Sequence, residues 1–368
     1  MKNFSEKHIF FCREIDTFIN LFVDSLIFKL SLNKDDILII IIPTKDRHPF
    51  NRALDVDYIE YKHEYIDDFV DAKSLSFISL NNVNSIIINE LIQTSKNVVK
   101  KLYILITDDE VDRWNKNFNK NSRLVEDTSQ NISKEVIKSL SYKLNFIMPQ
   151  EYFYSALSKI INLEKNNIVN SSIIFDILLT NESKKLYEKV KFIPKREKKI
   201  LLGSKAGSFG FKATVKILNS FIKTNMHEDY KFVCLNEGKH KIALKIYTIF
   251  LKVFKGFKFN IEFFKKTDPA TYNLMISSIS YFILQDRGGA STARVYTKWG
   301  CGTLCIMKDS PNANMFSKVF KINFINFDSY TDIASKIKIN NHKDVLENQT
   351  KVLEHEIESI KTLSKIYI

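Results

Sequence analysis

The sequence predicts an α/β protein made of two successive parallel-sheet domains. Its 368 residues are too many for a domain with one ordinary hydrophobic core, and this length favours two domains of roughly 150 to 200 residues each. Residues 36–43 (DILIIIIP) form a continuous apolar, β-branched run, which is typical of a parallel strand buried on both faces. Short apolar runs alternate with helical stretches, and a basic stretch with one proline, residues 184–199, interrupts this alternation near the middle. We therefore expect a domain junction at that stretch.

In the first half, strand-like and helix-like segments alternate, which predicts a sheet with right-handed crossovers. We expect a first domain over residues 1–190. Its predicted strands are 8–12, 36–43, 76–80, 85–88, 102–107 and 144–148, and its predicted helices are 14–32, 89–100, 133–142 and 151–163.

The same alternation restarts after the basic stretch. We expect a second domain over residues 195–330 and a charged helical segment over 331–368. The sequence thus predicts two Rossmann-like domains facing a cleft, with C-terminal helices, which is the GT-B architecture. The predicted strands are 199–203, 230–235, 257–264, 279–284, 303–307 and 321–327, and the predicted helices are 211–224, 239–254, 268–278 and 290–299.

Charge and composition narrow the partner classes. The net charge of +13 favours an acidic partner, which is nucleic acid, anionic lipid or a phosphorylated substrate. No helix-turn-helix, RRM or zinc pattern accompanies this charge, so nucleic acid is the less favoured alternative. Four cysteines are too few for a disulfide scaffold. The polar start of the chain and the lack of an apolar run of about 20 residues predict a cytoplasmic protein, with peripheral attachment to the inner membrane face left open.

A first candidate loop follows the strand predicted at 199–203. It reads GSKAGSFG over residues 203–210 and leads into a helix. Glycine lets the backbone approach a phosphate, and the free amides of a helix start attract anions. We therefore expect Gly203, Ser204 and Lys205 to contact a phosphate group. The alternative is an ordinary turn between strand and helix.

A second candidate loop lies in YFILQDRGGASTAR, residues 281–294, again between a strand and a helix. Paired glycines and small hydroxyl residues stand where a pyrophosphate would meet the amides of the helix start. Arg287 and Arg294 can neutralise phosphate charge. A plain tight turn is the alternative. The residues expected to bind here are Arg287, Gly288, Gly289, Ser291 and Thr292.

An acidic cluster at residues 107–114 (TDDEVDRW) supplies candidate general bases, namely Asp108, Asp109 and Glu110. Crowded carboxylates have raised pKa values, which favours proton uptake. The alternative is a helix start capped by Asp108. His8 and Asp16 are rival bases. No metal site is expected.

The helix predicted around residues 240–255 is basic and carries many apolar residues. Such a helix can lie on an anionic membrane. The favoured interpretation is an ordinary helix packed on its sheet, with its lysines in solvent.

Residues 195–330 resemble the donor domain of bacterial transferases that add 4-acetamido-4,6-dideoxygalactose from a TDP-sugar to lipid II-type disaccharides. The resemblance rests on Tyr281-Phe282-Ile283, the loop with Gly289 and Thr292, the helix ending at Gly300 and the later Pro311-Asn312. Residues 200–208 and 268–278 are similar to further elements of that family. The family's Arg-Gln-Gln before the glycine is replaced by Asp286-Arg287-Gly288.

This resemblance implies a GT-B glycosyltransferase with an inverting mechanism and a nucleotide-diphosphate sugar donor. The expected acceptor is a lipid-linked or cell-surface glycan, with an anionic membrane surface as a further partner. No nucleic acid and no cofactor other than the donor substrate are expected. The alternatives are a nucleic-acid-binding protein and a GT-B-like protein without catalytic activity.

Overall fold

A computed structural model gives the fold, and its chain divides into two compact units. The first unit comprises Met1–Phe175 and Glu356–Ile368, and the second comprises Asp176–His355. The structure describes residues 4–16, 18–44, 48–106, 111, 114, 144–161, 167–172, 176, 178–190, 198–235, 238–265, 267–340 and 344–368.

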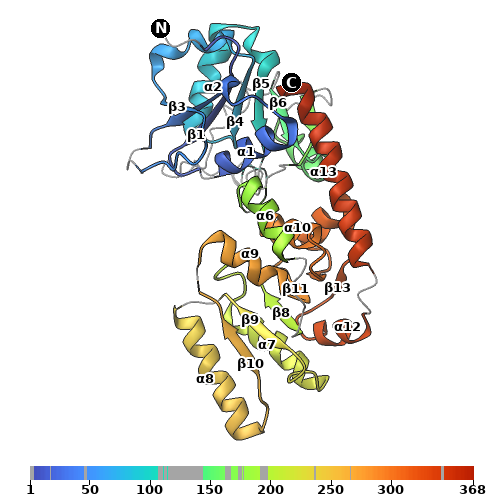
Figure 1. Ribbon diagram of the computed structural model, residues 1–368. Helices are drawn as coiled ribbons and strands as arrows, with labels where there is room; N and C mark the ends of the chain where they lie inside the picture. The colour runs from blue at the N-terminus through green and yellow to red at the C-terminus, as the bar shows by residue number, and fades with distance from the viewer. Residues whose placement is uncertain are drawn as a thin grey trace. The chain divides into compact units, whose positions relative to one another are not determined.

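The first unit contains a seven-stranded parallel sheet (Figure 1) with the order β3-β2-β1-β4-β5-β6-β7. Every side chain of β1 and β2 is buried, which confirms that the apolar run forms a strand covered on both faces. The strand order reverses between β1 and β4, and such a reversal is where open α/β sheets bind ligands. The strands are β1 (His8–Arg13), β2 (Ile37–Ile42), β3 (Asp57–Glu60), β4 (Ser74–Ile78), β5 (Leu102–Leu105), β6 (Asn145–Met148) and β7 (Ile168–Asn170).

The described helices of the first unit include one that the sequence predicted as a strand. Residues 85–88 lie inside α2, because Asn81 accepts hydrogen bonds from the amides of Val83 (2.9 Å) and Asn84 (3.1 Å) and thereby caps a helix start. The helices are α1 (Phe18–Leu30), α2 (Asn82–Thr94) and α5 (Gln150–Leu157), with short 3-10 turns η1 (Lys34–Asp36), η2 (His63–Tyr65), η3 (Asp68–Asp71) and η4 (Val98–Lys101).

The second unit contains a six-stranded parallel sheet with the order β10-β9-β8-β11-β12-β13. Its order reverses between β8 and β11, which are hydrogen-bonded neighbours. The strands are β8 (Lys199–Leu202), β9 (Lys231–Cys234), β10 (Asn260–Phe263), β11 (Tyr281–Ile283), β12 (Thr303–Met307) and β13 (Ile325–Phe327). The helices are α6 (Thr180–Val190), α7 (Phe211–Lys223), α8 (Gly238–Lys255), α9 (Pro269–Ser277), α10 (Ala290–Lys298), α11 (Pro311–Lys318), α12 (Ile333–Ile339) and α13 (Val345–Tyr367).

The division between the units lies earlier than the junction expected at residues 184–199. The helix α6 belongs to the second unit, where the rings of Tyr187 and Trp299 lie 5.9 Å apart. The basic residues of α6 therefore sit on a packed helix and not on a linker.

The helix α13 begins in the second unit and ends in the first. Tyr367, 1% exposed, stacks on Phe10 with ring centroids 5.6 Å apart, and its hydroxyl lies 2.9 Å from the Ser76 Oγ. Glu356 also forms a 2.8 Å ion pair with Lys29 of α1. The expected helical segment at 331–368 therefore supplies part of the core of the first unit.

His8, a rival candidate base, occupies a structural position. It opens β1 at the amino end of the sheet, it is 5% exposed, and its Nδ1 lies 2.8 Å from the Ser74 Oγ. Ligands meet parallel sheets at the carboxyl ends of strands, so His8 stands at the wrong end for catalysis. Burial, assisted by the charge of Lys73, lowers the pKa of His8 from 6.5 to about 4.

We expect this histidine to make stability depend on pH. Its pKa is lower in the folded state, so its contribution is complete above pH 6.5 and is lost as the pH falls towards 4. Between pH 7 and pH 5 the loss is about 2 kcal/mol. Urea unfolding at both pH values should show that His8→Gln reduces this loss by that amount. An equal loss in both proteins would contradict the assignment.

Candidate functional site

Both candidate loops leave neighbouring strands at the point where the strand order of the second sheet reverses. The first follows β8 and the second follows β11. The strands pair as far as Ile283 and Leu202, and the amide of Gly203 donates to the carbonyl of Ile283 at 2.9 Å. The structure thus brings Gly203 and Ser204 together with Gly288 and Gly289, although more than 80 residues separate the two loops in sequence.

Gln285 connects the two loops. Its Nε2 donates to the Ser204 Oγ at 2.6 Å and to the Gly288 carbonyl at 2.9 Å, while its Oε1 accepts from the Ser204 amide at 3.1 Å. From α11, the Asn312 Nδ2 donates to the carbonyls of Gln285 (2.6 Å) and Gly288 (2.9 Å). These hydrogen bonds fix the loop that carries the paired glycines. Gln285 is not among the residues that the sequence predicts for the site, and its signal in the sequence is a polar residue directly after an apolar strand.

Two helices begin at this edge without a side-chain cap. Gly210 precedes α7 and Gly289 precedes α10, and neither helix start has a side-chain cap hydrogen bond among the described residues. In the same unit, Asp268 caps α9 and Ser310 caps α11.

The first hydrogen bond of α10 runs from the Ala293 amide to the Gly289 carbonyl at 3.0 Å. The amides of Ala290, Ser291 and Thr292 therefore lie before the first hydrogen bond within the helix and point towards its start. A helix start of this kind attracts an anion.

A cavity of about 340 Å³ opens beside the first loop. Tyr272 on α9 forms one wall, and its hydroxyl donates to the Ser204 carbonyl. Burial raises the pKa of Tyr272 to about 12, partly offset by a side-chain hydrogen bond with Thr292, so the hydroxyl keeps its proton at neutral pH. The lining residues come from the ends of β8, β9 and β10 and from α9, and they are Ser204, Lys205, Ala206, Leu235, Phe264, Lys265, Thr267 and Tyr272.

The basic residues near this edge differ in their surroundings. Lys205 is exposed and Arg287 is half-buried. Arg294, by contrast, is 5% exposed, and one of its nitrogens lies 3.4 Å from the carboxylate of Asp176, which Lys298 also contacts at 3.3 Å. Arg294 is therefore a weaker candidate for neutralising phosphate charge than Arg287, because it is buried and shares the carboxylate of Asp176 with Lys298.

The candidate bases of the first domain are only partly described. Asp108, Asp109 and Glu110 lie outside the described residues. Asp16 follows the carboxyl end of β1, where the strand order of the first sheet reverses, and its carboxylate accepts from the Arg13 guanidinium at 2.8 and 3.1 Å. Within the residues that the structure describes, no group of three or more His, Cys, Asp or Glu side chains could hold a metal ion.

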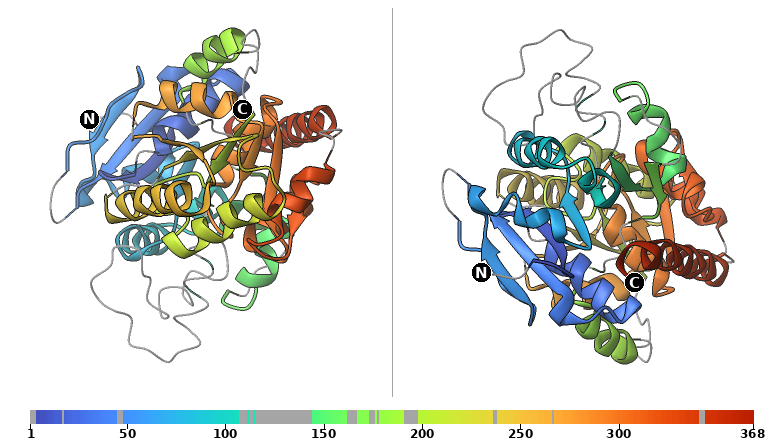
Figure 2. Two further views of the ribbon diagram at one scale, coloured as in Figure 1. Left: turned by 90° about the horizontal axis from the view of Figure 1, so that it is seen from below. Right: turned by 90° about the horizontal axis from the view of Figure 1, so that it is seen from above.

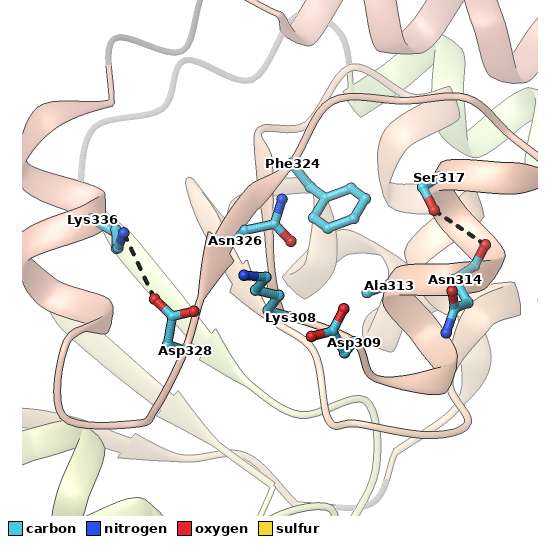
Figure 3. Close-up of a pocket in the computed structure, with 9 residues that line it drawn as sticks. All are labelled: Lys308, Asp309, Ala313, Asn314, Ser317, Phe324, Asn326, Asp328 and Lys336. Atoms are coloured by element: carbon cyan, nitrogen blue, oxygen red, sulfur yellow. Dashed lines mark hydrogen bonds and ion pairs between the residues drawn. The ribbon is translucent and has the colours of Figure 1, made fainter.

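A second cavity, of about 420 Å³, lies beyond β12 and β13 (Figure 3). Its lining includes Asp309 and Asp328, together with Lys308, Lys336 and the ring of Phe324. Asp328 pairs with Lys336 at 4.0 Å. The two carboxylates of this cavity offset the charge of its two lysines, so the region of strand-order reversal is the better candidate for a diphosphate.

Solved structures share this architecture across the whole chain. A glycosyltransferase from Rickettsia africae ESF-5 matches with a TM-score of 0.62 and 10% identity, over 99% of this chain and 98% of that chain. The chain has the GT-B fold.

Two further GT-B structures cover nearly the whole chain. Anabaena Alr3699/HepE in complex with UDP matches with a TM-score of 0.59 and 8% identity over 97% and 100% of the two chains. WaaG, a glycosyltransferase involved in lipopolysaccharide biosynthesis, matches with a TM-score of 0.53 and 9% identity over 95% of each. No protein-family model and no curated protein sequence matches the chain. The two Rossmann-like units expected from the sequence are thus confirmed as a GT-B fold, while the kinship with TDP-sugar:lipid II transferases stays a prediction.

Proposed function

We propose that this GT-B protein is a glycosyltransferase whose second unit holds a nucleotide-diphosphate sugar. One observation carries the proposal. Two helices without side-chain caps, α7 and α10, begin at adjacent strand ends where the strand order reverses, with Lys205 and Arg287 in the loops before them. Amides at helix starts and a guanidinium are suited to the two phosphates of a nucleoside diphosphate. The neighbouring cavity beside Tyr272 has room for the attached nucleoside.

The same groups would assist the chemistry. When the bond between sugar and phosphate breaks, negative charge develops on the departing diphosphate. Amides of Ala290, Ser291 and Thr292 and the charge of Arg287 stabilise that charge, and Gln285 and Asn312 keep the loop in place beforehand. Such prearranged donors act most strongly in the transition state. The proposed phosphate-binding residues are Gly203, Ser204, Lys205, Arg287, Gly288, Gly289, Ser291 and Thr292.

For the acceptor, we propose a lipid-linked or cell-surface glycan precursor, activated by a carboxylate of the first unit. Asp108, Asp109 and Glu110 remain the proposed bases, with Asp16 as the rival among the described residues. Transfer would be inverting and independent of metal. The net charge of +13 supports a working position next to an anionic membrane surface on the cytoplasmic side. The structure describes no helix that is long and apolar enough to span a membrane.

A thermal-shift series with UDP, TDP, GDP and ADP tests the donor site. One diphosphate should raise the melting temperature, because a ligand at about 100 times its Kd stabilises the folded state by about 2.7 kcal/mol. Lys308→Ala, at the second cavity, should leave the shift unchanged. The nucleic-acid alternative would be favoured if none of the four diphosphates raised the melting temperature and if the protein bound duplex DNA or RNA in a filter-binding assay at moderate salt.

Transfer itself requires a separate assay. GT-B-like structures include a putative UDP-N-acetylglucosamine 2-epimerase from Listeria monocytogenes, with a TM-score of 0.50 and 11% identity. The assay must therefore follow labelled sugar into an acceptor as well as the release of diphosphate. Binding of a sugar nucleotide without any transfer or release would favour the inactive alternative.

A further inference from the structure

The helix α8 presents an apolar face to solvent. Only Leu244 and Leu251 of this 18-residue helix are buried hydrophobic residues. The helix lies beside α7 (Figures 1 and 2), with the Tyr247 hydroxyl donating to the Asn219 Oδ1 at 2.7 Å. Leu244 belongs to the same core cluster as residues of β8 and β9, which agrees with a helix packed on its sheet, and the helix additionally exposes apolar residues. The exposed apolar residues are Ile242 (60%), Ile246 (63%), Ile249 (61%), Phe250 (44%), Val253 (66%) and Phe254 (75%).

These residues form one continuous stripe. Ile242, Ile246, Ile249 and Val253 follow the four-three-four spacing that places side chains on one side of a helix. The rings of Phe250 and Phe254 lie 5.2 Å apart, so they contact each other while remaining exposed. Single exposed apolar residues are ordinary on a surface, but six on one helix mark an interaction surface.

The charge of the helix indicates the chemistry of the partner. The sequence GKHKIALKIYTIFLKVFK contains five lysines and no acidic residue. Lys241 and Lys245 lie along a different side from the apolar stripe, with their Nζ atoms 5.7 and 5.9 Å from the Phe263 ring centroid. An apolar stripe next to a lysine row matches the boundary between acyl chains and anionic headgroups.

A second copy of the chain fits this surface poorly. A symmetric contact between two α8 helices would bring two lysine rows close together without an acidic residue on either helix to neutralise them. The lysines also prevent α8 from crossing a bilayer. We propose that the outward face of α8 inserts into the interface of a membrane containing anionic lipid, with the helix parallel to the membrane plane. This surface would hold the donor-binding unit at the membrane. Binding of the protein to vesicles is independent of nucleotide binding at the donor site.

Vesicle flotation of the full chain tests the proposal. The wild type should float with phosphatidylcholine vesicles that contain about a quarter phosphatidylglycerol, and weakly with pure phosphatidylcholine. Ile246→Ser with Val253→Ser should lower the partition coefficient about tenfold or more. The matched control, Ile339→Ser with Leu346→Ser, removes side chains of similar exposure (76% and 74%) elsewhere in the same unit and should change nothing.

A series of lysine substitutions separates the electrostatic contribution to vesicle binding from the apolar contribution. Lys245→Gln and Lys252→Gln should each reduce binding to anionic vesicles about fivefold, and added salt should reduce it further. Lys318→Gln and Lys321→Gln, also exposed, are the controls. Arg287→Ala should bind vesicles like the wild type, so a failure of the donor site and a failure of this surface are distinguishable. Equal losses in the α8 variants and in the controls would overturn the proposal. The proposal would also be overturned if the chain did not bind anionic vesicles and instead formed a dimer without lipid, and if Ile246→Ser with Val253→Ser dissociated that dimer.

Discussion

Gly289→Ala is expected to abolish nucleoside-diphosphate binding and to lower the melting temperature, and Gly288→Ala is expected to have a smaller effect on both. Both glycines have a φ of +77°, so alanine meets the same backbone strain at either position, about 1 to 2 kcal/mol. Their surroundings differ. A Cβ at Gly289 would lie 2.2 Å from the Ser204 Oγ and 2.6 Å from the Gln285 Nε2, while a Cβ at Gly288 meets nothing within 4 Å.

The difference between the two variants isolates the hydrogen bonds that connect the loops. Gly289→Ala must separate Ser204 from Gln285, which adds roughly 1 to 3 kcal/mol of overpacking and moves the start of α10. Calorimetric titration with the preferred diphosphate measures the loss of affinity in both variants, and thermal unfolding measures the loss of stability. If both variants lost binding to the same degree, the left-handed backbone and not the contact with Ser204 would be responsible.

Arg287→Ala is expected to reduce sugar transfer about 10² to 10³-fold while the protein stays folded. The expected loss is that of one charged donor to the departing diphosphate. Arg287 is half-buried in the loop before α10, so its removal leaves no large cavity. Turnover measured under saturating donor separates this effect from weaker binding.

Two substitutions serve as controls. Lys308→Ala removes a positive charge from the same edge of the sheet, after β12, and should retain full turnover. Arg287→Lys keeps the charge without the paired nitrogens and should fall between Arg287→Ala and the wild type. Near wild-type turnover in Arg287→Ala would exclude Arg287 from the phosphate site.

The order of elements could be predicted because the central strands of each sheet are buried on both faces. Continuous apolar runs such as Ile37–Ile42 are then hard to misassign. The strand predicted at residues 85–88 is wrong, since a short apolar run has no periodicity that separates strand from helix. The decisive signal was the cap at Asn81, several residues earlier. The strands β3 and β7 were missed because they are short and their described side chains are only partly buried or exposed.

The candidate site was predictable only in part. Paired glycines after a strand identified the loop after β11 from local sequence. The contribution of Gln285, Asn312 and Tyr272 depends on hydrogen bonds to loops up to 81 residues away, and no local pattern specifies these. The orientation of α8 was unpredictable for a related reason. Its periodicity is compatible with several buried sides, and packing against the sheet through Leu244 and against α7 decides which one faces solvent.

The return of α13 to the first unit has a consequence for biosynthesis. A ribosome makes Tyr367 after the entire second unit, yet this ring completes the core around Phe10 and Phe22 of the first. Domains usually fold in the order of their synthesis. Here the second unit can complete its folding first, because the first unit lacks part of its core until residues 356–368 have left the ribosome. Removal of residues 356–368 would therefore destabilise the first unit more than the second, because Tyr367 and Glu356 pack against the first unit.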